Sequence, residues 1–320
     1  MRKLNVLIAG STGYIGVQLI KLLVKHKYVN IRYLCGNNSV GKNISFYDKS
    51  LNIKKLPKII KYDKKYLNNI DVIFTALPNG EAQKISKNLL KKNTLIDLAA
   101  DFRLEKSSEY SKWYKQKHKA TKNIKKSIYA LPEISANKVK KFDIISCPGC
   151  YPTSILLPLI PLFQFNAINN NMIIDSKSGY SGAGRGVHLK YKNKNLYKSL
   201  SAYGVGFHRH NAEINQELNK YTKSKIELIF TPHLSPMFRG ILSTFYLELK
   251  KGFSIKRIHK ILKKFYKKSF FIKVLKLNSL LSTNEVINTN NCFISICKTK
   301  NKKKIIILSA IDNLIKGGAG

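Results

Sequence analysis

A glycine-rich run near the N-terminus constrains this chain more than any other feature. The run follows an apolar stretch, Leu4 to Ala9, and opens a segment with helical spacing, Val17 to Lys25. It consists of Gly10, Ser11, Thr12, Gly13, Tyr14, Ile15 and Gly16. Glycines at this spacing allow a tight strand-to-helix turn and let a pyrophosphate approach the free N–H groups at the helix start. The context predicts a dinucleotide site; a tight turn without a ligand is the alternative.

The first 150 residues alternate short apolar runs with segments of helical spacing. This alternation is typical of a parallel sheet covered by helices on both faces. After the first strand, we expect strands at 31–35, 72–76, 94–98 and 143–146. The segment that ends the second strand, Leu34 to Val40, has no acidic residue to bind the ribose hydroxyls of NAD, so the sequence favours NADP.

Beyond Cys150 the pattern changes to strands with a few helices, typical of an α+β domain. We expect antiparallel strands at 172–175, 225–232, 244–250, 272–276, 292–298 and 304–309, and helices at 211–220 and 255–267. The predicted fold class is α/β, a Rossmann-type doubly wound parallel sheet with a second α+β domain. The first domain is expected to span 1–149, with 310–320 returning to it, and the second 150–309.

The chain is strongly basic, with 58 Lys plus Arg against 17 Asp plus Glu and a formal charge of +41. An apolar content of 44% excludes simple disorder. Basic charge can indicate nucleic-acid binding, but only seven of the basic residues are Arg, the type favoured for phosphate and base recognition. The lysines are scattered among abundant Asn, Ile, Tyr and Phe, the set that A/T-rich codons encode. We therefore attribute the charge to composition and expect no nucleic-acid partner.

Nothing in the sequence indicates a membrane or an oxidising compartment. The longest apolar stretch, Ile155 to Phe163, is interrupted by Pro158 and Pro161 and falls far short of about 20 residues. Five Cys form an odd, sparse set. Such a set fits a reducing, cytoplasmic location, where a Cys is catalytic, metal-binding or simply buried.

A second motif is the run from Cys147 to Thr153, where a short strand ends and a helix begins near Pro152. The helix dipole and its free N–H groups stabilise a thiolate at a helix N-terminus. Cys150 is the better placed nucleophile, and Cys147 is expected to be a packing residue. A redox dithiol and half of a zinc site are the alternatives, but a second C-x-x-C pair is lacking, so no metal site is expected.

A third motif, His208-Arg209-His210, stands at the entry of a helix in the second domain. Two histidines beside a cation can supply a general acid or base for an anionic substrate, and surface histidines are the alternative. Two Gly-rich runs, 178–186 and 230–240, indicate loops where backbone approaches a ligand, or ordinary tight turns.

Taken together, these motifs resemble N-acetyl-gamma-glutamyl-phosphate reductase, the arginine-pathway relative of aspartate-semialdehyde dehydrogenase. The resemblance runs from end to end of the chain. It rests on residues 10–16, 76–80, 97–104, 147–153, 181–185, 208–210, 231–242 and 312–317.

The resemblance implies an NADPH-dependent reduction of N-acetyl-L-glutamyl 5-phosphate to the 5-semialdehyde. Cys150 would attack the acyl phosphate to give a thioester, NADPH would reduce it, and a protonated His would protonate the oxyanion, with His208 favoured over His210. The implied cofactor-binding residues are the 10–16 run with Ser181, Gly182 and Asn313. The cations available for the substrate's carboxylate and phosphate are Arg103, Arg185, Arg209 and Arg239. The family also implies a homo-oligomer, a dimer or tetramer.

Two features depart from the family. Gly36-Asn37-Asn38 stands where the family places an Arg for the 2′-phosphate of NADP, so Lys42 would have to compensate. The chain ends at Gly320, where a further helix is expected. Three alternatives stay open: a lysine-pathway relative that reduces a carrier-bound aminoadipyl phosphate, a basic nucleic-acid-binding protein, and an inactive remnant.

Overall fold

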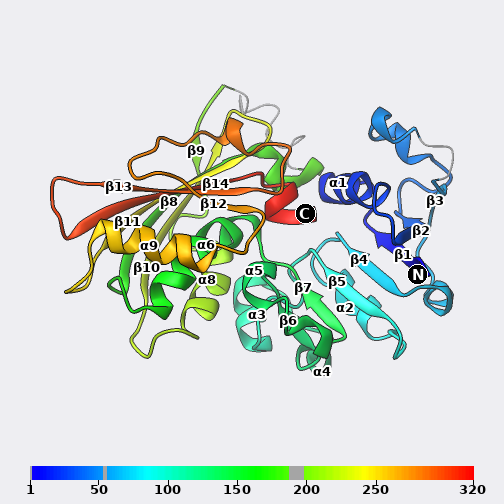
Figure 1. Ribbon diagram of the computed structural model, residues 1–320. Helices are drawn as coiled ribbons and strands as arrows, with labels where there is room; N and C mark the ends of the chain where they lie inside the picture. The colour runs from blue at the N-terminus through cyan, green and yellow to red at the C-terminus, as the bar shows by residue number, and fades with distance from the viewer. Residues whose placement is uncertain (1, 53–55, 187–197) are drawn as a thin grey trace. The chain divides into compact units, whose positions relative to one another are not determined.

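The computed structural model describes residues 2–52, 56–186 and 198–320, which form two compact units (Figure 1). The first unit contains the chain up to Gly149 together with Gly318–Gly320, and the second is Cys150–Gly317. Only the last three residues group with the first unit, rather than the whole stretch 310–320. The reason is that the last strand of the second unit continues to Ile311, which pairs with Cys292 and Ile241.

In the first unit, the described residues form a seven-stranded sheet in the order β3-β2-β1-β4-β5-β7-β6, with every pair parallel. The strands are β1 Leu4–Ala9, β2 Val29–Cys35, β3 Ile59–Ile60, β4 Val72–Thr75, β5 Thr94–Asp97, β6 Ser127–Tyr129 and β7 Ile144–Ser146. The helices are α1 Tyr14–Leu23, α2 Glu81–Ser86, α3 Ser107–Tyr114, α4 Thr121–Ile124 and α5 Pro132–Ser135. The doubly wound parallel sheet expected from the sequence is confirmed, and β3 and β6 are additions too short to show a pattern.

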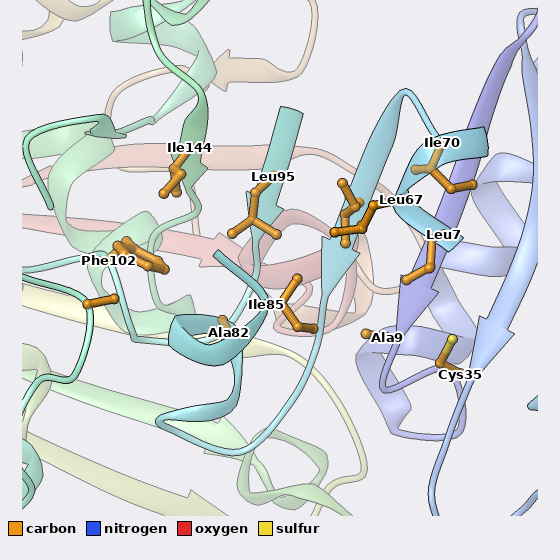
Figure 2. Packing of buried hydrophobic residues seen from close by; sticks show 12 residues of the cluster. Leu7, Ala9, Cys35, Leu67, Ile70, Ala82, Ile85, Leu95, Phe102 and Ile144 are labelled. Carbon is orange, nitrogen blue, oxygen red and sulfur yellow. The ribbon is translucent and has the colours of Figure 1, made fainter. Parts of the chain in front are cut away.

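Alternating side chains of β1 pack on opposite faces of this sheet, as the period of two in a strand requires. Val6 and Ile8 belong to one buried cluster with side chains of α1. Leu7 and Ala9 belong to another, with Ile85 of α2 (Figure 2). The near-continuous apolar run of β1 is thus explained by burial on both faces.

In the second unit, the described residues form a seven-stranded sheet in the order β12-β13-β14-β11-β8-β10-β9. The strands are β8 Asn171–Gly179, β9 Ser201–Ala202, β10 Glu227–Ser235, β11 Ile241–Glu248, β12 Ile272–Val274, β13 Cys292–Lys298 and β14 Lys304–Ile311. The helices α6 Cys150–Gln164, α8 His210–Leu218 and α9 Ile255–Phe265 lie on one side of it (Figure 1). The α+β architecture is confirmed, but the expectation of purely antiparallel strands is wrong.

Two strand pairs of this sheet are parallel, namely β8 with β10 and β12 with β13. Parallel neighbours need a crossover connection, and the long segment from β8 to β10 includes α8. Within the described part of the chain, no helix has the length and apolar character needed to span a bilayer.

Candidate active site

The glycine-rich turn joins β1 to α1, as the sequence predicts. Gly10 has a φ of +86°, and a Cβ there would lie 2.2 Å from the carbonyl oxygen of Ala76. A Cβ on Gly16 would lie 2.2 Å from the carbonyl oxygen of Gly10. Gly13 is the residue before the helix and its position leaves ordinary room for a Cβ. Two of the three glycines are therefore required for close backbone packing, and the turn leaves the α1 N-terminus open for a pyrophosphate.

A cavity of about 750 Å³ adjoins this turn in the first unit. Its lining comes from the segments that follow β1, β2, β3 and β4, the carboxyl edge where ligands bind in open parallel sheets. The hydroxyl of Tyr62, at the cavity's edge, is buried without a hydrogen-bond partner. An orphaned buried hydroxyl and a backbone cradle made by glycines both fit a dinucleotide.

The two cysteines of the Cys147–Thr153 run occupy different environments. Cys147 follows β7, and burial, with a smaller contribution from the Asp97 carboxylate, raises the pKa of its thiol to about 12. Cys150 is the first residue of α6, and both cysteines are partly exposed, so the two differ in position and not in accessibility. At neutral pH Cys147 is therefore a neutral packing residue, whereas Cys150 lies where the helix dipole favours a thiolate.

Gly317 packs against Cys150 within the second unit. A Cβ added at Gly317 would lie 2.7 Å from the Cβ of Cys150 and 3.0 Å from its Cα. Any other residue at 317 would displace the cysteine. Gly317 ends the 312–317 motif, but its contact with Cys150 could not be predicted, because nothing local marks the approach of the C-terminal turn to α6.

Arg103 supports the turn that carries Cys147. Its Nε donates to the carbonyl oxygen of Cys147 at 2.8 Å, and its Nη2 donates to that of Leu98 at 3.1 Å. The side chain is buried. These hydrogen bonds join the segment after β5 to the segment after β7. Arg103 therefore positions the turn that contains Cys147.

His208 lies among aromatic rings just before α8. Its ring centroid is 5.6 Å from that of Tyr151, 5.4 Å from Tyr203 and 5.7 Å from Phe230, in edge-to-face contacts. Burial, and to a lesser extent the Arg209 guanidinium, lowers the pKa of His208 to about 4. The backbone N–H of His210 donates to Nδ1 of His208 at 3.2 Å, so the proton of the neutral ring is on Nε2.

His210 is the first residue of α8 and is buried. Its Nε2 is 3.7 Å from Oε1 of Glu213, one helical turn later, whose side chain is fully buried. A carboxylate at this distance orients the imidazole and can exchange a proton with it. The histidine and its glutamate therefore form a buried pair that can carry a proton.

Tyr151 joins the nucleophile segment to both histidines. It follows Cys150 directly, and its ring contacts those of His208 and His210, the latter at 5.8 Å between centroids. Its hydroxyl donates to the carbonyl oxygen of His233 at 3.2 Å and accepts from the Tyr203 hydroxyl at 3.2 Å. Tyr151 could not be assigned a role from the sequence, since its neighbours on α8 and β10 are brought to it only by the tertiary packing.

The two Gly-rich runs lie side by side in the second unit. A Cβ on Gly179 would meet the backbone nitrogen of Arg239 at 2.6 Å. Asn313 locks them together: its Nδ2 donates to the Ser181 hydroxyl at 3.0 Å, and its Oδ1 accepts from the Gly240 N–H at 2.7 Å. Ser181 and Asn313 are buried, and Gly182 lies against the Asn313 amide.

The remaining predicted cations lie in different surroundings. Arg239 is mostly buried, with its Nε 3.0 Å from a carboxylate oxygen of Asp312, which is fully buried. Arg185 and Arg209 are exposed. Among the residues that the structure describes, no group of three or more His, Cys, Asp or Glu could hold a metal ion.

Comparison with known proteins agrees with this architecture. A family model described as "Semialdehyde dehydrogenase, NAD binding domain" matches residues 5–142, and "Semialdehyde dehydrogenase, dimerisation domain" matches residues 150–313. Among solved structures, aspartate semialdehyde dehydrogenase II of Vibrio cholerae has a TM-score of 0.72 at 15% identity, over 99% of this chain and 96% of that one. The Candida albicans aspartate semialdehyde dehydrogenase with NADP has a TM-score of 0.67 at 17% identity, over the same shares of the two chains.

Curated relatives are similar over nearly the whole chain. The N-acetyl-gamma-glutamyl-phosphate reductase of Thermoanaerobacter pseudethanolicus is 42% identical over 316 residues, 98% of this chain and 91% of that protein. That of Ehrlichia canis is 40% identical over 322 residues, 99% of this chain and 92% of the relative. A probable chloroplastic reductase of Arabidopsis thaliana is 39% identical over 98% of this chain and 78% of its own length.

The fold and these matches define a semialdehyde dehydrogenase, a class of oxidoreductases that use NAD or NADP. Within that class, the chain belongs to the N-acetyl-gamma-glutamyl-phosphate reductase family.

Proposed function

We propose that this protein reduces N-acetyl-L-glutamyl 5-phosphate to N-acetyl-L-glutamate 5-semialdehyde and inorganic phosphate, consuming NADPH and a proton, in arginine biosynthesis. The observation that carries the proposal is the similarity to reductases of that name over 98% of the chain. A cysteine at the start of α6 and a buried His–Glu pair on α8, with the ring of Tyr151 in contact with that histidine, support it.

Cys150 is the nucleophile in this proposal. Its thiolate attacks the acyl carbon, the C–O bond to phosphate breaks, and a thioester remains on the enzyme. When bound on the glycine-rich turn, the cofactor supplies the hydride that reduces this thioester. Collapse of the resulting thiohemiacetal returns the thiol and releases the aldehyde.

His210 is the proton donor in this proposal. Its imidazolium, held by Glu213, protonates the oxyanion that forms as the thioester is reduced. Sequence reasoning favoured His208, but the low pKa of that residue leaves it without an acidic proton at neutral pH. His208 instead packs against Tyr151 and caps the start of α8 through its Nδ1.

The anionic groups of the substrate are assigned to exposed cations. Arg209 adjoins both histidines in the sequence, and Arg185 is part of the Gly-rich segment after β8. Arg103 and Arg239 hold backbone carbonyls and a buried carboxylate, respectively, so we give them a positioning role. Ser181, Gly182 and Asn313 remain our candidates for the nicotinamide end of the cofactor.

An assay in the reverse direction tests this function. With NADP and phosphate, we expect turnover of N-acetyl-L-glutamate 5-semialdehyde, measured by the absorbance of the NADPH that forms. An aminoadipate semialdehyde analogue should give no turnover. Turnover of the analogue alone would overturn the proposal in favour of a lysine-pathway reductase.

The sheet of the second unit exposes an apolar row on the face opposite α6, α8 and α9. Ile229, Ile173, Tyr246 and Ile306 are consecutive register partners across β10, β8, β11 and β14. The first three side chains are 61%, 47% and 47% exposed. The match of this unit to a dimerisation domain supports a second copy of the chain as the partner on this face.

Replacing Ile229 with lysine should weaken this dimer at least about a hundredfold, because a charge would be buried in both copies. Sedimentation or light scattering over a concentration series measures the change. The matched control is Phe270→Lys, which alters an exposed apolar residue after α9 and should leave the oligomer intact. An unchanged oligomer in Ile229→Lys would contradict the assignment of this face.

A further inference from the structure

The 2′-phosphate of NADP needs a positively charged partner at the adenosine end of the nucleotide cavity. NADP differs from NAD by a 2′-phosphate, which the fold places beyond the end of the second strand. In this chain β2 is followed by Gly36, Asn37, Asn38 and Ser39, all of which line the cavity and none of which is charged. A cation for the 2′-phosphate must come from elsewhere along the cavity wall.

Strand β3 brings such a cation to the same edge. It pairs in parallel with β2, with Cys35 opposite Ile60, and the N–H of Gly36 donates to the carbonyl oxygen of Ile60 at 3.0 Å. The next residue after Ile60 is Lys61, which also lines the cavity. The segments after β2 and β3 therefore leave the sheet side by side.

The backbone at Lys61 is fixed by packing on either side. Ile60 and Tyr62 both pack against the buried cluster shown in Figure 2. Gly36 also lies close to the side chains of Ile59 and Thr12. A Cβ added at Gly36 would be 3.3 Å from Cγ2 of Ile59 and 3.6 Å from Cγ2 of Thr12. The lysine is thus held on a rigid edge next to the glycine-rich turn, while its side chain is exposed.

Other charged groups near the cavity form ion pairs with neighbouring side chains. Lys84 lines the cavity but forms an ion pair with Glu81 at 2.6 Å. Asp63, two residues after Lys61, accepts from the N–H of Lys65 at 2.9 Å and pairs with its ammonium at 3.5 Å. Among the residues that the structure describes, none forms an ion pair with Lys61.

Lys42, the cation that sequence reasoning suggested, lies in a different place. Its carbonyl oxygen accepts from the N–H of Ile59, at the start of β3 and not at its end. Its ammonium lies 4.5 Å from the centroid of the Phe46 ring, and Lys42 is not part of the cavity lining.

We infer that Lys61, at the end of β3, binds the 2′-phosphate of NADP and supplies the cofactor specificity that an arginine after β2 would otherwise give. This inference rests on the proposed use of a nicotinamide dinucleotide. The ammonium donates hydrogen bonds to the phosphate oxygens, and Asn37 and Asn38 can donate from their amides.

The test measures cofactor binding without turnover. NADPH and NADH are titrated by their fluorescence against wild type, Lys61→Ala, Lys61→Glu and the control Lys42→Ala. Lys61→Ala should weaken NADPH binding about tenfold to a hundredfold, the effect expected for one charge-assisted hydrogen-bond donor, and leave NADH within about twofold. Lys61→Glu should reverse the preference, and Lys42→Ala should leave both affinities unchanged.

Comparing the two cofactors separates specificity from damage to the fold, because only the 2′-phosphate distinguishes them. The salt dependence of NADPH binding should also fall in Lys61→Ala, since one screened charge pair is lost. Equal losses for NADPH and NADH, or a loss confined to Lys42→Ala, would overturn the assignment of Lys61. If wild type binds neither cofactor, the proposed function itself fails.

Discussion

Replacing Cys150 with serine is expected to lower the rate of acyl-phosphate reduction to less than about a hundredth of wild type. The reason is that a serine hydroxyl stays protonated at the start of α6, whereas the helix dipole and free N–H groups stabilise a thiolate there. Serine is no larger than cysteine, so the contact with Gly317 is kept. Initial rates with N-acetyl-L-glutamyl 5-phosphate and NADPH measure the effect.

Cys147→Ser is the matched control for this substitution. Burial raises the pKa of the Cys147 thiol to about 12, so it is not a nucleophile at neutral pH. We expect this variant to keep most of the wild-type kcat. Thiol labelling at pH 7 should likewise modify Cys150 and spare Cys147. Activity above a hundredth of wild type in Cys150→Ser, or a comparable loss in Cys147→Ser, would sink the assignment of Cys150.

The strands and helices could be predicted largely because their signals are local. The apolar run Leu4–Ala9 and the glycines after it lie within one short window, and the structure places β1 and the turn there. The relative direction of the strands in the second sheet could not be predicted. Alternation of apolar and polar residues is the same for parallel and antiparallel neighbours, and only the path of the chain between β8 and β10 decides it.

The site divides in the same way. The position of Cys150 at a helix start could be predicted from the sequence, because a thiol before a helix is a local pattern. The contacts of Tyr151, Gly317 and Lys61, on which our proposals rest, could not be predicted, because their neighbours are distant in the sequence. The contact of Glu213 with His210 could have been predicted, since Glu213 follows His210 by three residues, the spacing at which helical side chains meet.

Replacing His210 with asparagine distinguishes the two histidines as candidates for the general acid. Asparagine can still form hydrogen bonds but carries no acidic proton. We expect kcat to fall by about 10² to 10⁴, the usual contribution of a positioned general acid, with a smaller effect on KM. Glu213→Gln should lower kcat less, because the imidazole remains but loses the carboxylate that orients it.

His208→Asn is the matched control for His210→Asn. The pKa of His208, lowered to about 4 by burial, leaves its ring neutral throughout the pH range of the assay. An asparagine oxygen can accept the His210 N–H in place of Nδ1, so α8 keeps its start. We therefore expect a small loss of kcat and an unchanged pH profile above about pH 6, whereas His210→Asn should abolish the limb of the profile that reports the general acid. A larger loss in His208→Asn than in His210→Asn would transfer the role to His208, because only the residue that holds the transferred proton changes both kcat and the pH profile.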